Sequence, residues 1–186
     1  MTETNSKWLV VVNPMASVGK SGKDWPEIKQ ILIDQGIDFD DILTEYPRHA
    51  IEIVRNAIVE KGYRKFIAVG GDGTNNEVIN GIFTQDVVPT NEITMAALPI
   101  GTGNDWRRTF DIPLEYDKVA KIIKAGHTYA HDIGKLTYYD DGNTGIVRKF
   151  YSSGDYHKSL KEDCGGASAA SLGAVPTATV RPSNKR

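Results

Sequence analysis

The sequence is short of cysteine, of net charge and of long hydrophobic runs, and each shortage excludes a class of protein. A single cysteine, Cys164, cannot form an intramolecular disulfide or a cysteine-rich zinc site. No run approaches the ~20 apolar residues that span a bilayer, and residues 1–7 lack the apolar core of a signal peptide. A formal net charge of −2 gives no electrostatic basis for nucleic-acid binding. We therefore expect a cytoplasmic protein without a nucleic-acid partner.

What is present is an alternation of short apolar runs with helical patterns, in a chain of 186 residues that suits one ordinary domain and a tail. The apolar runs have the length of strands and lie at residues 8–12, 37–43, 65–69 and 93–98. The helical patterns lie at residues 24–36, where Asp24 is the expected N-cap of a capping box, and at residues 47–61 and 116–125. This order predicts an α/β fold with a mostly parallel sheet.

The pattern changes after residue 127. Residues 128–138 and 145–151 resemble two strands of a hairpin whose turn lies at residues 140–143. Beyond residue 151 there are few large apolar residues and no helical or strand periodicity, which predicts disorder. We therefore divide the chain into a first domain at 1–127, a hairpin at 128–151 that begins a β-rich second domain, and a tail at 152–186.

One stretch carries most of the chemistry. The apolar run at 65–69 enters the turn Gly70-Gly71-Asp72-Gly73-Thr74, and a helical pattern follows. Glycines lack the β-carbons that keep an anion away from backbone N–H groups, and we expect positive φ angles that aim those groups inward. Asp72 would repel a phosphate unless a metal ion lies between them or a proton must be accepted. The stretch predicts phosphoryl transfer with Mg²⁺ nearby. The alternative is an ordinary turn with Asp72 as a helix cap.

Two further loops follow apolar runs. After the first run, Gly19-Lys20-Ser21 suggests a P-loop, but the first glycine of that motif would fall on Pro14, so we reject it. This basic loop either covers nucleotide phosphates or is a solvated connector. After the fourth run, Gly101-Thr102-Gly103 leads into a helix with Arg107 and Arg108, which either bind phosphate or lie solvated on the surface. Loops that follow successive parallel strands can line one crevice at the carboxyl edge of the sheet.

Three motifs in register resemble the diacylglycerol kinase catalytic domain family, which includes bacterial diacylglycerol kinases, YegS-like lipid kinases and sphingosine kinases. They are Asn13-Pro14, Gly70-Gly71-Asp72-Gly73-Thr74-x-x-Glu77-Val78 and Pro99-x-Gly101-Thr102-x-Asn104-Asp105, within about residues 7–150. The resemblance implies a three-layer, Rossmann-like fold shared with NAD kinases and phosphofructokinases, and ATP-dependent phosphorylation of a lipid hydroxyl. It also implies a following β-sandwich domain with a late acidic residue as the general base, which residues 152–186 do not match.

The resemblance further implies roles for single residues. Asp72 is implied to be catalytic, acting on Mg²⁺ directly or through water, or activating the acceptor hydroxyl. The implied ATP-binding residues are Asn13, Thr44, Gly70, Gly71, Asp72, Gly73, Thr74, Asn75, Asn76 and Thr102. Asn104 and Asp105 are implied to shape the floor of the cleft that the lipid approaches. The metal ligands stay unknown.

The implied partners are ATP, Mg²⁺, a lipid alcohol such as diacylglycerol and, transiently, the membrane surface. A homo-oligomer is a further hypothesis. Two alternatives stay open, a catalytically incomplete nucleotide-binding module and an NAD kinase. NAD kinases usually have hydrophobic residues after the Gly-Gly-Asp-Gly-Thr motif, where this chain has Asn75-Asn76-Glu77, so we prefer a lipid kinase.

Overall fold

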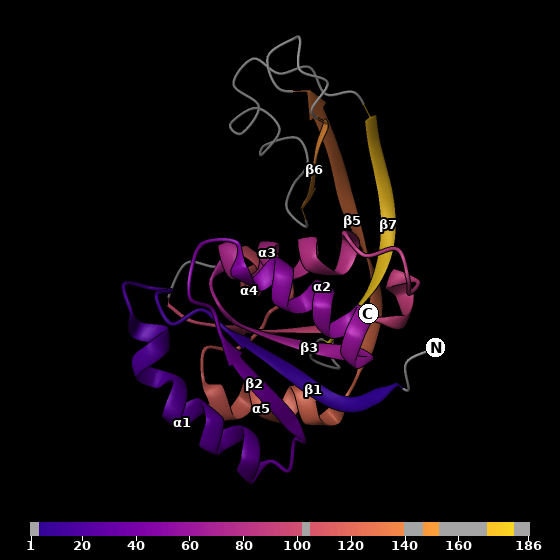
Figure 1. Ribbon diagram of the computed structural model, residues 1–186. Helices are drawn as coiled ribbons and strands as arrows, with labels where there is room; N and C mark the ends of the chain where they lie inside the picture. Colours follow the sequence, from indigo (N-terminus) through magenta and orange to yellow (C-terminus); the bar gives the residue numbers. More distant parts are fainter. Residues whose placement is uncertain (1–3, 102–104, 140–146, 153–170, 181–186) are drawn as a thin grey trace.

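The computed structural model describes residues 4–101, 105–139, 147–152 and 171–180. The strands are β1 (Asn5–Val12), β2 (Phe39–Leu43), β3 (Tyr63–Gly70), β4 (Thr94–Pro99), β5 (Thr128–Tyr139), β6 (Val147–Ser152) and β7 (Ser171–Val180). The helices are α1 (Lys20–Asp34), α2 (His49–Lys61), α3 (Asp72–Phe83), α4 (Asp105–Thr109) and α5 (Tyr116–Ala125), with a 3₁₀ turn at Thr90–Glu92. Figure 1 shows α2 and α3 on one face of the sheet and α1 and α5 on the other, so the fold has three layers.

The strand order is β2-β1-β3-β4-β7-β5-β6. Strands β1 to β4 are parallel to one another, which confirms the predicted α/β fold. From β1 the chain first adds β2 on one side and then crosses to place β3 on the other side. In open α/β sheets, ligands bind at such a reversal, beyond the carboxyl ends of the strands. The topology therefore directs attention to the loops that follow β1 and β3.

Buried apolar runs explain why β1, β3 and β4 lie inside the sheet. Residues 9–12, 66–69 and 95–98 are all buried, as expected for parallel strands that helices cover on both faces. Above them, α2 and α3 approach closely at Gly81, where a Cβ would lie 2.7 Å from the Val54 Cβ. A larger residue would separate the two helices and so displace the loops at their amino ends.

Helix α1 begins earlier than predicted. Its N-cap is Gly19 rather than Asp24, because residues 17–19 take left-handed φ angles of 54°, 57° and 80° and turn the chain directly into the helix. Asp24 lies inside the helix, where its carboxylate accepts hydrogen bonds from Lys20 and, at 2.5 Å, from the Tyr116 hydroxyl. The capping-box pattern was therefore a misleading signal for the helix start.

The antiparallel pairing of β5 with β6 confirms the predicted hairpin, whose turn at 140–143 lies outside the described residues. Both strands extend the same sheet, with β6 at its edge. Strand β7 differs from the predicted disorder of residues 152–186, since it lies between β4 and β5 and pairs with residues 128–137. Its β-branched residues suit a strand, but the partners that order it come from distant segments, which local periodicity does not reveal. The domain boundaries at 127 and 151 stay predictions.

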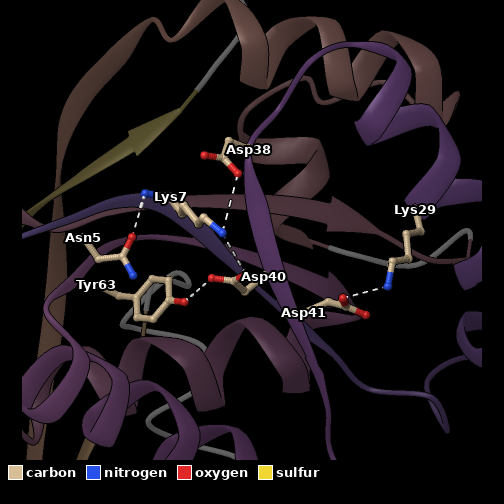
Figure 2. A network of polar contacts seen from close by, with 7 residues as sticks. All are labelled: Asn5, Lys7, Lys29, Asp38, Asp40, Asp41 and Tyr63. Atoms are coloured by element: carbon tan, nitrogen blue, oxygen red, sulfur yellow. Dashed lines mark hydrogen bonds and ion pairs between the residues drawn. The ribbon is translucent and has the colours of Figure 1, made fainter.

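The amino ends of β1, β2 and β3 carry a paired polar network, shown in Figure 2. Lys7 Nζ lies 3.2 Å from one Asp40 carboxylate oxygen, and the Tyr63 hydroxyl donates to the other. Lys29 of α1 donates to Asp41 at 2.8 Å. The hydrogen bond from Tyr63, with a smaller effect of Lys7, lowers the pKa of Asp40, and burial raises the pKa of Tyr63 to about 12. These side chains thus find polar partners within the protein.

Candidate functional site

The carboxyl ends of β1 and β3 meet through Asn13, Gly70 and Thr74. The Asn13 backbone N–H donates to the Val69 carbonyl at 3.0 Å, and the Asn13 side-chain amide donates to Thr74 Oγ1 at 3.2 Å. A Cβ at residue 70 would lie 2.3 Å from Thr74 Oγ1, so this position requires glycine. The contact holds the first turn of α3 against the loop after β1. Three residues that the sequence predicted for the site thus come together.

Helix α3 begins at this point, with Gly71 as its N-cap. The N–H groups of a first helical turn have no partner within the helix. A Cβ built at Gly71 or Gly73 would meet no atom of the described residues within 4 Å, so open space adjoins this backbone in the part of the chain that the structure describes. The predicted positive φ angles are wrong, since Gly71 has a φ of −100° and the glycines with positive φ lie elsewhere. Glycine instead leaves space beside the backbone. This space adjoins the positive end of the helix dipole, which favours an anionic group.

Asp72 joins the loop after β3 to helix α4. One carboxylate oxygen accepts the Asp105 N–H at 2.9 Å, and the other accepts the Trp106 N–H at 3.3 Å. Asp72 is therefore a helix cap, as the alternative interpretation has it, but it caps α4 rather than the helix that it begins. Among the described residues no three His, Cys, Asp or Glu side chains are grouped so as to hold a metal ion.

The loop after β4 contacts both other loops. The Ile100 N–H donates to the Gly70 carbonyl at 2.9 Å. Gly101 has a φ of 90°, and a Cβ there would lie 2.3 Å from Ser17 Oγ. The two glycine-rich turns that the sequence placed after successive strands therefore lie together at the carboxyl edge. Thr102 and Asn104 lie outside the described residues, and their roles stay predictions.

The basic side chains near this edge have local partners. Lys20 bonds to Asp24, and this hydrogen bond raises the pKa of Lys20. Arg108 pairs with Asp105 at 3.0 Å, and Arg107 donates to a backbone carbonyl oxygen at 3.4 Å. These contacts engage the three side chains within the protein, Lys20 also through the Tyr116 hydroxyl and Arg107 through the Ile112 carbonyl, and none of them points to a phosphate. The backbone N–H groups at the start of α3 are then the main candidates for binding an anion.

The two asparagines after Thr74 differ in their surroundings. Asn75 is 2% exposed and shares the buried stripe of α3 with Val78 and Ile79. Neither polar atom of its side chain has a hydrogen-bond partner within the described part of the chain. Asn76 Oδ1 instead accepts a hydrogen bond from Asn80 at 3.0 Å. Asn75 therefore carries a buried amide that no described residue satisfies, near the start of α3, and such groups call for an explanation.

The loop after β2 is tied to this edge from two sides. The Thr44 N–H donates to the Val12 carbonyl at 2.8 Å. The N–H of Arg48, the N-cap of α2 with a φ of 69°, donates to Glu77 Oε1 of α3 at 3.1 Å. Sequence reasoning missed Glu77 as a structural contact, since its partner is 29 residues away. Thr44, which is predicted to bind ATP, directly follows β2. The loop that it begins is hydrogen-bonded to both β1 and α3.

Comparisons with known proteins agree with this geometry. Residues 7–136 match the diacylglycerol kinase catalytic domain. The chain is 31% identical over 139 residues to the Bacillus subtilis protein named "Putative lipid kinase YtlR", covering 73% of this chain and 43% of that protein. It is 34% identical over 133 residues to a diacylglycerol kinase of Staphylococcus epidermidis, covering 68% of this chain and 39% of that protein. A crystal structure of a "putative diacylglycerol kinase" from Bacillus anthracis matches with a TM-score of 0.60 at 27% identity, covering 73% of this chain and 44% of that one.

The chain therefore belongs to the diacylglycerol kinase catalytic domain family, as the three sequence motifs predicted. It spans less than half the length of the relatives named above. No helix in the described ranges is long and apolar enough to cross a membrane.

Proposed function

We propose that this chain binds ATP with Mg²⁺ at the carboxyl edge of the sheet and phosphorylates the hydroxyl of a lipid such as diacylglycerol at the membrane surface. The observation that carries the proposal is the open space beside Gly71 and Gly73 at the start of α3. Backbone N–H groups and the helix dipole favour an anion at that position. Membership in a family of lipid kinases supports the choice of acceptor.

The protein's part in phosphoryl transfer is to position the reactants rather than to form covalent intermediates. The first turn of α3 would bind the phosphates, with Asn13 and Thr74 holding that turn in place. Thr44 would bind ATP from the loop after β2, and Thr102 from the loop after β4. Asn104 and Asp105 would lie toward the lipid acceptor.

Two carboxylates at this edge would hold the magnesium ion together with the phosphates of ATP. Proteins commonly bind Mg²⁺ through one or two carboxylates together with substrate phosphates, and Asp72 and Asp105 lie on two loops that contact each other. When bound, Mg²⁺ neutralises charge on the transferring phosphoryl group. Asp72 would hold the ion while its hydrogen bonds to α4 keep the loop after β4 in position.

The test is titration calorimetry of the full chain with Mg-ATP, followed by phosphate transfer to diacylglycerol micelles. We expect the wild-type chain to bind and to transfer. Asp72→Ala removes the charge and the cap, and we expect it to lower transfer by about 10²–10³-fold. Asp72→Asn is the matched control, because asparagine still caps a helix but carries no charge. Transfer by Asp72→Asn at the wild-type rate would show that the charge has no catalytic role.

A second candidate function is a nucleotide-binding module that does not transfer phosphate. The observation in its favour is that both carboxylate oxygens of Asp72 already accept backbone N–H groups of α4, as those of a purely structural cap would. Binding of Mg-ATP without transfer to the lipid would select this candidate. Absence of binding would contradict both.

A further inference from the structure

We propose that Tyr46 and His49, in the loop between β2 and α2 and at the start of α2, form a stacking platform for the nucleobase of the bound nucleotide. This inference rests on the proposed nucleotide-binding function and extends it. It assigns a binding role to two side chains that the motifs do not include.

The two rings form a fixed pair. Their centroids are 4.2 Å apart and their planes differ by 10°, so the rings are stacked. The Tyr46 hydroxyl donates to Glu52 Oε2 at 2.8 Å, and His49 Nδ1 accepts the Glu45 N–H at 3.1 Å. Because both rings are held by hydrogen bonds, a ligand that stacks on them would meet a surface that is already ordered. Such preorganisation lowers the entropic cost of binding.

The pair is nevertheless accessible. Tyr46 stays 47% exposed although His49 stacks on its ring, so part of the tyrosine is open to a ligand. Fixing an exposed aromatic ring in one position lowers its conformational entropy, and burial of the ring does not compensate for this loss. A second flat surface that stacks on the ring would bury it. Every nucleobase has such a face, whatever polar groups it carries at its edges.

The position of the pair suits the base of a nucleotide whose phosphates lie at α3. Arg48, between the two rings in sequence, donates its N–H to Glu77, one turn beyond the start of α3. Thr44, two residues before Tyr46, bonds to the carboxyl end of β1. The platform and the open space at Gly71 and Gly73 therefore belong to loops that are hydrogen-bonded through α3 and β1. Neither feature alone defines a nucleotide site, but together they provide one place for phosphates and one for the base.

The test separates the base from the phosphates. The full chain and its variants are titrated with Mg-ATP and, in parallel, with magnesium tripolyphosphate, which has no base. We expect Tyr46→Ala to weaken ATP binding by about 5- to 150-fold and to leave tripolyphosphate binding unchanged. Tyr46→Phe is the matched control, because it keeps the ring and loses only the hydrogen bond to Glu52. We expect it to bind ATP within about threefold of the wild type.

The outcomes are distinct. Equal ATP binding by Tyr46→Ala and the wild type would overturn the platform while leaving the proposed function intact. Equal weakening of ATP and tripolyphosphate would also overturn it, because the loss would then concern the phosphates or the fold. A wild-type chain that binds neither ligand would contradict the proposed function itself. Circular dichroism of each variant checks that the fold is retained.

Discussion

The two edges of the parallel sheet differ in how they treat polar groups. At the amino edge, Lys7, Asp40 and Tyr63 bond to one another (Figure 2). At the carboxyl edge, open space adjoins Gly71 and Gly73, and the buried amide of Asn75 has no partner among the residues that the structure describes. The same strands thus end in paired polar side chains at one edge and beside open space and an unpartnered amide at the other. The difference teaches that polar pairing contributes to stability at the amino edge, whereas the carboxyl edge is the one at which we propose that a ligand binds.

The largest expected effect comes from filling the open space. Gly71→Val adds a side chain whose Cβ meets no atom of the described residues within 4 Å, and the φ of −100° is accessible to valine. We expect ATP affinity to fall by about 100-fold, equal to ~2.7 kcal/mol, with a change of less than ~1 kcal/mol in the free energy of unfolding. Calorimetry and urea unfolding measure the two quantities. Unchanged ATP affinity would show that the phosphates lie elsewhere.

The second prediction concerns the amino edge and its pH dependence. Folding raises the pKa of Tyr63 from 10.0 to about 12, so the unfolded chain loses this proton first. The free energy of unfolding should be unaffected below pH 10 and should fall by about 2 kcal/mol as the pH rises from 10 toward 12. Tyr63→Phe removes this dependence while other groups titrate as before. Urea unfolding of both proteins over this range tests the prediction, and parallel pH profiles would contradict it.

The third prediction addresses the unsatisfied amide. Asn75→Leu replaces a buried polar group by an apolar one of similar size on a stripe shared with Val78 and Ile79. We expect the free energy of unfolding to rise by about 1–2 kcal/mol. If Asn75 binds the nucleotide, ATP affinity should fall in the same variant. Greater stability with unchanged affinity would remove Asn75 from the predicted binding residues.

The smallest effect is expected from an exposed ion pair. The side chains of Lys7 and Asp40 are 41% and 46% exposed, so solvent screens their attraction. Lys7→Ala should lower the free energy of unfolding by about 0.5 kcal/mol and leave ATP affinity unchanged. A clear loss of ATP affinity would show that the two edges are coupled through the sheet.

Local patterns predicted the elements well and their contacts less well. Apolar runs located β1, β3 and β4, because strands that helices bury on both faces have an unambiguous signature. The glycine motif located the start of α3 and the family. The contact of Glu77 with the start of α2 was not predicted, and for Asp72 the sequence suggested a helix cap but not that the capped helix is α4. Their partners lie 29 and 33 residues away, and only the assembled fold brings them together.

The contact between Gly70 and Thr74 makes the two positions dependent on each other. A Cβ at residue 70 would lie 2.3 Å from Thr74 Oγ1 and 2.8 Å from Thr74 Cβ, so a side chain at one position excludes a side chain at the other. Random mutagenesis with selection for folding should therefore recover changes at residue 70 only together with glycine at residue 74. Such a double change would also remove the hydroxyl that Asn13 holds. The order of the two changes therefore matters, because residue 74 must lose its side chain before residue 70 can gain one.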